Sequence, residues 1–451
     1  MGSDSVASWR RCASDVLSAV LIACLYVPAF AGVPDAPARV VVAWTEGSPN
    51  DGRLRSFPAA DPWNFDRPTL SVGGNATLRV AGDLLYAVSR TDASVSVIDL
   101  NAWTVLRTLS VGAGREPVDI AVIAPDLAYV SCADETHLLR FDPSTGDTTP
   151  VVDLSIFADA DGVPELNMMA LHEGRLFIQL RRFDPSTLSF AQPAMLAVMD
   201  VSTEQLIDAD AATPGTQAIE LQGMAPKLKM QVVESTRRPR SGLAGAAGKG
   251  STVGSEGPSS PHAVGCRLFV SASGDFFDDG GLEIVDLDTL QSLGLIVRED
   301  DDRVGADLGA FVLVTPDRGY LTFSTDLAVS SHLVEFTVSG GVVPSGALFE
   351  TVGYFVPTLP LDPQSGTFFF PDGGAQPSSV HVLDAGSASH LATISLGAGD
   401  VPTDVIVIRS AVAGPPIPAA SNWSVAILAL LVIAAGTVLL VRGQRRRAPE
   451  V

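Results

Sequence analysis

Clusters of acidic side chains are the feature of this sequence best suited to chemistry. They lie in short polar stretches between apolar segments, and the candidate metal ligands are Asp159, Asp161, Glu165, Asp275, Asp278, Asp279, Asp300, Asp301 and Asp302. Carboxylates suit a hard cation such as Ca²⁺, which takes about six to eight oxygen ligands. The alternative is a solvated acidic rim, because Asp and Glu are mostly exposed in folded proteins. The sequence leaves both interpretations open.

Signals for catalysis are absent from the sequence. The segment DADG at 159–162 is no EF-hand, because Phe157 occupies the first ligand position and Met168 the last. The six His residues are dispersed, without H-x-H, H-E-x-x-H or C-x-x-C spacing, and neither a G-x-S-x-G elbow nor a P-loop occurs. We therefore assign no catalytic and no cofactor-binding residue.

A repeat of short apolar segments must position these acids. Six segments align on one residue, which is Asp99, Asp142, Asp200, Asp286, Thr337 or Asp384, as in SVSVIDL and SVHVLDA. A second apolar segment precedes each anchor, and a third follows most of them. Four short strands in each repeat of about 45 residues are typical of a β-propeller blade, which must stack on its neighbours to bury both faces.

The two ends of the repeat region predict a seventh blade. RVVVAWT, GRLRSF and PTLSVG supply three strands near the N-terminus, and TDVIVIRS at 403–410 supplies the innermost strand. Pairing of these segments closes the ring and removes exposed sheet edges. We therefore expect an all-β, seven-bladed propeller of four-stranded antiparallel blades over residues 32–410.

The best copy of the repeat, LLYAVSR…SVSVIDLNAWTVLRTLSVGAGREPVDIAV, resembles the YVTN-type bacterial propeller repeats. These are related to lactonase-like and quinoprotein-dehydrogenase-like propellers. The resemblance spans residues 39–410 and implies a seven-bladed ring. It is weakest in the blade in which Thr337 replaces the anchor Asp.

Successive loops of a four-stranded blade lie on alternate faces of the ring. The loop in which a polar residue falls therefore predicts the face on which it lies. The anchor Asp residues end third strands before tight turns, where Asp accepts backbone hydrogen bonds, so we predict a structural role. The acidic clusters collect at the opposite face, beside Arg115, Lys227 and Lys229. These cations can pair with carboxylates or hold an anionic ligand, and pairing is favoured.

Three other features of this region are predicted from its residues. The Gly/Ser/Pro-rich stretch at 237–265 is typical of a disordered loop inserted between the first and second strands of one blade. His137, His332 and His381 fall on third strands, away from the ring centre. Cys132 and Cys266 fall on second strands of non-adjacent blades and are expected to be reduced.

The N-terminus predicts secretion. Residues 1–31 contain an Arg pair, an apolar run and an Ala-Phe-Ala site before Gly32, which is the pattern of a signal peptide. The rival interpretation is a lipoprotein signal, in which Cys24 is lipidated.

The C-terminus predicts membrane attachment. Residues 424–441 are free of charge and long enough to cross a bilayer, and the basic tail at 442–451 is expected inside. Ile417, Pro418, Ser421 and Trp423, in the linker at 411–423, resemble the IPTL-CTERM class of bacterial sorting signals, relatives of PEP-CTERM tails. That resemblance implies recognition by an exosortase-type protease. A plain tail anchor would give the same topology.

Charge and context limit the function. The net charge of −22 disfavours nucleic acid as a partner. We predict a non-catalytic binding module at the cell envelope that contacts a protein or carbohydrate through its acidic loop face, with Ca²⁺ as a candidate cofactor. The alternative is a lactonase-like or quinoprotein-like enzyme. A lactonase for sugar phosphates requires a cationic pocket, which the sequence does not indicate.

Overall fold

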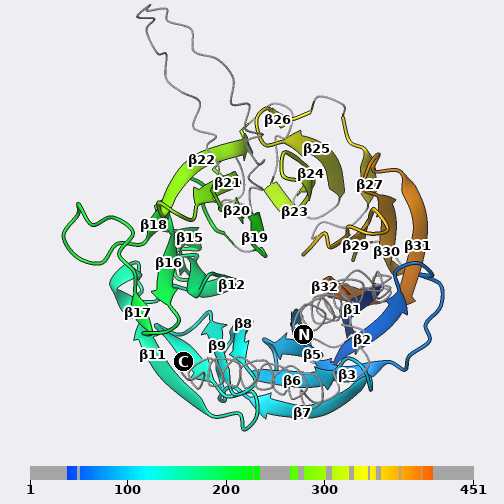
Figure 1. Cartoon of the computed structure of the whole chain (residues 1–451), viewed down its shortest axis with the longest axis horizontal. Helices are drawn as coiled ribbons and strands as arrows, with labels where there is room; N and C mark the ends of the chain where they lie inside the picture. Colours follow the sequence, from blue (N-terminus) through cyan, green and yellow to red (C-terminus); the bar gives the residue numbers. More distant parts are fainter. Residues whose placement is uncertain are drawn as a thin grey trace, which may run out of the picture. The chain divides into compact units, whose positions relative to one another are not determined.

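The computed structural model describes residues 38–47, 51–226, 228–233, 265–272, 279–300, 307–324, 330–343, 346–351, 357–374, 377–397 and 399–409. Pro37–Ile408 forms one compact unit. Seven antiparallel sheets in this unit surround a central channel (Figure 1). The predicted seven-bladed β-propeller is therefore confirmed.

The blades follow the chain, each written here from its innermost strand outward. The blade that contains both ends of the ring has β32 (Asp400–Ile408), β1 (Arg39–Glu46), β2 (Asp51–Pro58) and β3 (Leu70–Gly73). The next two have β4 (Ala76–Ala81), β5 (Leu84–Ser89), β6 (Ser94–Asp99) and β7 (Thr104–Ser110), then β8 (Pro117–Ala124), β9 (Leu127–Cys132), β10 (His137–Phe141) and β11 (Thr148–Asp153). After the short 3-10 helix η1 (Ser155–Phe157) come β12 (Leu166–His172), β13 (Arg175–Leu180) and β16 (Ala194–Asp200), edged by β17 (Gln205–Leu206) and β18 (Ile219–Leu221).

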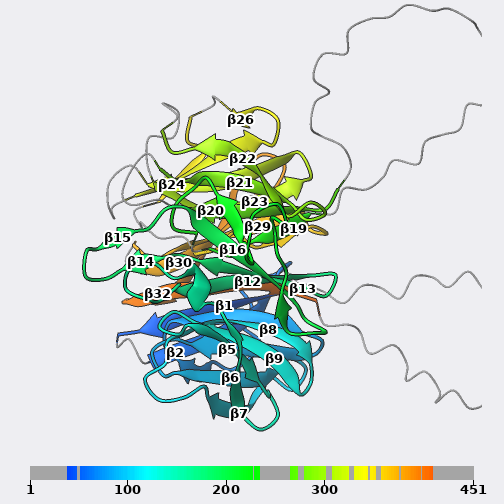
Figure 2. The same ribbon diagram turned by 90° about the vertical axis from the view of Figure 1, so that its left-hand side faces the viewer.

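The remaining blades complete the ring. They have β19 (Gln231–Val233), β20 (Arg267–Ala272), β21 (Gly281–Asp286) and β22 (Gln291–Arg298), then β23 (Asp307–Thr315), β24 (Arg318–Ser324) and β25 (Ser331–Thr337), edged by β26 (Gly341–Val342) and β27 (Phe349–Thr351). The last has β28 (Leu361–Asp362), β29 (Thr367–Asp372), β30 (Ser378–Asp384) and β31 (His390–Gly397). A separate hairpin of β14 (Phe183–Asp184) and β15 (Ser189–Phe190) projects from one face of the ring (Figure 2).

The ring closes through its two ends, as predicted. β1 pairs with β32 along its length, from Arg39 opposite Ile408 to Glu46 opposite Asp400. Apolar side chains of neighbouring blades form the core between them, as where Tyr86 and Val97 contact Ile120 and Val130. The strands can therefore be apolar on both faces because each blade is covered on both sides.

The repeated Asp residues stabilise turns, as expected. The Oδ1 atom of Asp99 accepts hydrogen bonds from the backbone N–H groups of Asn101 and Ala102, both at 2.8 Å. Asp142, Asp200, Asp286 and Asp384 make equivalent bonds in their own turns. In the blade in which Thr337 replaces the anchor Asp, Thr337 Oγ1 accepts a hydrogen bond from the N–H of Gly340 at 3.1 Å. The hydroxyl thus takes over the role of the carboxylate.

Four residues after each anchor, the backbone enters the left-handed region. Gly146 and Gly341 occupy this position in two blades, but Ala388 does so with a φ of 55°. Glycine adopts this conformation without a steric cost. We expect Ala388→Gly to raise the free energy of unfolding by about 0.5–1 kcal/mol in denaturant titrations. Ala385→Gly in the same turn, where no positive φ occurs, should not stabilise the protein, and an equal gain there would contradict this explanation.

Several predictions concern residues outside the described part of the chain. These are the signal peptide at 1–31, the segments at 411–423, 424–441 and 442–451, and almost all of the insertion at 237–265. The strands β19 and β20, which flank that insertion, pair as the first and second strands of one blade. Among the described residues, no helix has the length and apolar character needed to cross a membrane. Cys132 is a buried free thiol, as expected.

Candidate functional site: the central channel

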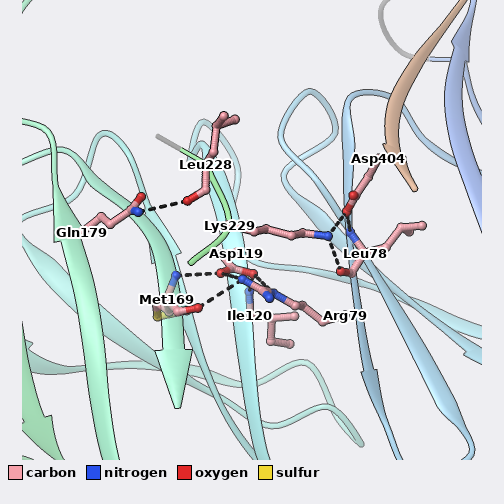
Figure 3. Close-up of polar contacts among 9 residues, drawn as sticks. All are labelled: Leu78, Arg79, Asp119, Ile120, Met169, Gln179, Leu228, Lys229 and Asp404. Carbon is pink, nitrogen blue, oxygen red and sulfur yellow. Dashed lines mark hydrogen bonds and ion pairs between the residues drawn. The ribbon is translucent and has the colours of Figure 1, made fainter. Parts of the chain in front are cut away.

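A layer of ion pairs, each formed by a buried acid and a partly buried cation, crosses the channel at mid-depth. Arg79 on β4 donates to Asp119 on β8, with Nε–Oδ1 at 2.7 Å and Nη2–Oδ2 at 2.5 Å. Lys229, just before β19, forms an ion pair with Asp404 on β32. Figure 3 shows Lys229 reaching Asp404 beside the Arg79–Asp119 pair. We call these four residues the ion-pair layer.

Backbone groups of neighbouring blades complete the hydrogen bonds of this layer. Asp119, which is fully buried, also accepts from the N–H groups of Ile120 and Met169 at 2.9 and 2.8 Å. Asp404 Oδ2 accepts from the N–H of Leu78 at 2.7 Å. Asp119 therefore links its own blade to the blades of β4 and β12, and Asp404 links its own blade to the blade of β4 and to Lys229.

The segment that carries Lys229 is held by buried amides. Gln179 donates from Nε2 to the carbonyl of Leu228 at 3.0 Å, and Asn167 donates from Nδ2 to that of Pro226 at 3.2 Å. Lys229 Nζ also donates to the carbonyl of Leu78 at 3.1 Å. Burial lowers the pKa of Lys229, and the negative charge of Asp404 opposes that shift.

A cavity of about 250 Å³ lies at the end of the channel where the innermost strands begin. We call it the central cavity, and its lining residues are Asn75, Thr77, Arg90, Pro117, Val118, Asn167, Met168, Arg181, Leu228, Lys229, Pro357, Thr403 and Asp404. Three of these side chains are cationic and one is acidic. Lys229 pairs with Asp404 and Arg90 pairs with Glu116, so it is the positive charge of Arg181 that favours a ligand with a negatively charged group.

Two side chains in this lining have polar atoms without a partner among the described residues. Asp404, which is 2% exposed, has no hydrogen bond at Oδ1, and Arg181 has none at Nε. Burial and the nearby positive charge of Arg90 lower the pKa of Arg181, while Glu165 opposes the shift. The guanidinium also lies 5.4 Å from the ring centre of Phe190. A buried polar atom without a partner is costly, so both atoms are suited to binding a ligand.

The other half of the channel is apolar. Hollows of about 290 and 340 Å³ are lined by the ends of the innermost strands, including Val80, Val122, Leu171 and Val407. Arg79, which belongs to the ion-pair layer, borders both hollows and marks the boundary between the apolar half of the channel and this layer. The channel thus has two chemically different mouths, separated by the ion-pair layer.

The acidic metal candidates only partly come together. Asp159 Oδ1 accepts from the N–H of Asp161 at 3.2 Å, and the buried Glu165 accepts from that of Phe183 at 2.5 Å. Burial raises the pKa of Glu165 to about 8, with smaller contributions from Asp161 and Asp159.

The other candidates are separated or outside the described residues. Asp300 pairs with Arg298 at 2.9 Å, and Asp279 contributes to the electrostatics of the buried Glu299. Asp275, Asp278, Asp301 and Asp302 lie outside the described residues. Among the described residues, no group of three His, Cys, Asp or Glu side chains is placed to hold a metal ion. The Ca²⁺ site stays a prediction.

The cations expected on this face are paired where they are described. Arg115 Nε lies 2.7 Å from Glu135 Oε1, and Lys229 pairs with Asp404. Lys227 lies outside the described residues. Two cations that the sequence did not single out, Arg90 and Arg181, line the same cavity as Lys229, and Arg90 is paired with Glu116. They come from loops of different blades, so their spacing in the sequence gave no signal.

Comparison with known proteins adds the fold alone. No family model and no curated protein matches the chain. A 6-phosphogluconolactonase-like protein from Bacteroides fragilis is 11% identical, with 84% of this chain and 99% of that chain covered and a TM-score of 0.51. The likeness is one of fold. AztD from Citrobacter koseri is 14% identical over 83% of this chain and 98% of that one, with a TM-score of 0.46. The dihydro-heme d1 dehydrogenase NirN is 11% identical over 85% and 77%, with a TM-score of 0.47.

Proposed function

We propose that this protein is a non-catalytic binding module whose central cavity takes a small carboxylate that also carries hydrogen-bond donors, such as a hydroxy acid or an amino acid. The observation that carries the proposal is that Arg181 Nε and Asp404 Oδ1, two buried polar atoms without a partner among the described residues, belong to side chains that line the same cavity. A guanidinium binds a carboxylate through paired hydrogen bonds. A hydroxyl or ammonium group of the same ligand would supply the donor that Asp404 lacks.

The dimensions of the channel support a small ligand that enters from one side. The cavity of about 250 Å³ lies just below the range of about 300–1,000 Å³ for pockets that hold drug-sized ligands. The ion-pair layer limits its depth. Ligand therefore enters from the face of the acidic loops. In this proposal, those loops form the approach to the cavity and the surface for a protein or carbohydrate partner.

The proposed setting is the outside of a bacterial cell envelope. The apolar run with its Ala-Phe-Ala site at 1–31 supports secretion, and the uncharged stretch at 424–441 supports a membrane anchor. The resemblance of Ile417, Pro418, Ser421 and Trp423 to a sorting signal supports recognition by an exosortase-type protease. The repeats themselves support membership of the YVTN-type propellers.

Titration calorimetry on the purified full-length chain tests the proposed ligand class. A panel of hydroxy acids and amino acids should include at least one ligand whose binding weakens at least tenfold in Arg181→Gln, because one guanidinium interaction is lost. The control is Arg53→Gln, which removes an Arg paired with Glu46 outside the cavity. Failure of the whole panel to bind, or equal binding by Arg181→Gln, would overturn the proposal.

A lactonase-like enzyme is the second candidate, and the cationic lining of the cavity favours it. Turnover in a screen of sugar lactones that is lost in Arg181→Gln would replace the non-catalytic proposal. Titration with Ca²⁺ separately tests the predicted cation site. The absence of both heat and a shift in melting temperature would remove Ca²⁺ from the proposal.

A further inference from the structure

Two histidines that are nine residues apart in the sequence meet between β30 and β31. His381 lies in the middle of β30, opposite Thr393, and His390 begins β31. In an unbroken ladder, His390 would lie on the other face of the sheet. A bulge beside Leu383 adds one residue to β31 and pairs His390 with Leu383. The bulge therefore brings both imidazoles to the same face.

The nitrogen atoms of these rings have the spacing of metal ligands. His381 Nδ1 lies 3.4 Å from His390 Nε2. Two nitrogens bound to one tetrahedral ion at about 2.0–2.1 Å are separated by roughly 3.4 Å. Thr393 Oγ1 lies 3.0 Å from the first nitrogen and 2.8 Å from the second. A triangle of this size leaves a point that is about 2 Å from all three atoms.

A buried carboxylate orients the ring of His381 so that Nδ1 faces His390. The other ring nitrogen of His381, Nε2, lies 3.4 Å from the buried carboxylate of Asp372. Such a carboxylate holds the proton on Nε2 and leaves the lone pair on Nδ1, as is usual for histidines that bind metals.

An aromatic side chain from the next blade covers the pair. Phe349 on β27 stacks on His390 with ring centres 5.5 Å apart and meets His381 edge-on at 4.9 Å. Figure 1 shows β27 beside β30 and β31 at the circumference of the ring. An apolar neighbour of this kind restricts water and fixes the orientation of the ligands.

We propose that His381 and His390 form a binding site for a divalent transition-metal ion of the Zn²⁺ class, with the Thr393 hydroxyl beside the ion and water in the remaining position. Imidazole nitrogens favour such ions over the hard cations Ca²⁺ and Mg²⁺. The site lies on the outermost two strands of its blade and shares no residue with the central cavity. The metal site therefore goes beyond the proposed function, and its test is independent of the test of that function.

Zn²⁺ titration of the full-length chain in metal-free buffer at pH 7.5 tests the site. We expect one Zn²⁺ per chain to bind with a rise in melting temperature, and His381→Gln and His390→Gln each to weaken binding at least tenfold. Ca²⁺ should not compete. His332→Gln is the matched control, because His332 occupies a third strand in the neighbouring blade and lies 3.3 Å from the carboxylate of Glu350 and not beside a second imidazole among the described residues.

The titration has outcomes that overturn the proposal. Undiminished Zn²⁺ binding in the double variant His381→Gln/His390→Gln, or no binding by the wild-type chain, would do so. If the variants do not fold, modification of the wild-type chain by diethyl pyrocarbonate gives the answer. Zn²⁺ should protect His381 and His390 but not His332, and equal modification of all three would contradict the site.

Discussion

Asp119→Ala should lower the free energy of unfolding by about 3–5 kcal/mol, the largest effect that we expect of a single substitution in the channel. The carboxylate is fully buried and accepts two hydrogen bonds from Arg79 and two from backbone N–H groups. Its loss leaves the partly buried guanidinium of Arg79 without its counter-ion and two N–H donors without an acceptor. Each of these defects is costly in a site of low dielectric.

Urea titration of the variant and two companions measures this effect. Asp126→Ala changes an exposed residue in the turn between β8 and β9 of the same blade and should alter stability by no more than about 0.5 kcal/mol. Asp119→Ala/Arg79→Met removes both charges and should recover part of the loss, because no buried charge remains unpaired. A loss in Asp119→Ala no larger than that in Asp126→Ala would show that the ion pair contributes little.

The fold could be predicted because its determinants are local. Asp99 and Asp384 bind backbone groups two and three residues ahead, so their role follows from a short stretch of sequence. Each blade repeats this turn, which fixes the number of blades. The closure of the ring by β1 and β32 could also be predicted, because the N-terminal segments supply only three strands of their blade and a C-terminal segment supplies the innermost one.

The channel could not be predicted in the same way, because its contacts join residues far apart in the chain. Lys229 and Asp404 are separated by 175 positions, and Arg79 and Asp119 by 40. Their meeting depends on which residue of each innermost strand faces the centre. One signal was present in the sequence, since Arg79 and Asp119 are single charges within otherwise uncharged strands. A charge at such a position requires a partner from another blade.

The contact between His381 and His390 could not be predicted from the sequence for a related reason. Their spacing matches no metal motif, and ordinary pairing of β30 with β31 would separate them across the sheet. The bulge beside Leu383 decides their meeting, and bulges depend on tertiary packing more than on local sequence.

Stability should fall as the pH rises from about 5 to 8, because two buried acids hold their protons in the folded state. Burial raises the pKa of Glu299 to about 8, opposed by hydrogen bonds from the N–H groups of Leu308 and Gly280, and that of Glu165 to about 8 as well. In the unfolded chain both titrate near 4.5. Above that pH the unfolded state releases protons that the folded state retains, which favours unfolding by up to about 1.4 kcal/mol per pH unit for each acid.

The carboxylates of the turns make stability depend on pH in the opposite direction. They set the pH below which stability falls. Hydrogen bonds from Ser202 and Ser387 lower the pKa of Asp200 and Asp384, so their contribution is present above the unfolded value of 3.8 and is lost as the pH falls below it. The melting temperature should therefore be highest near pH 5. Glu299→Gln should flatten the decline between pH 5 and 8, whatever its effect on absolute stability, while Glu220→Gln on the exposed edge strand β18 should leave the slope unchanged. A melting temperature that rises over this interval would mean that Glu165 and Glu299 are ionised in the folded protein.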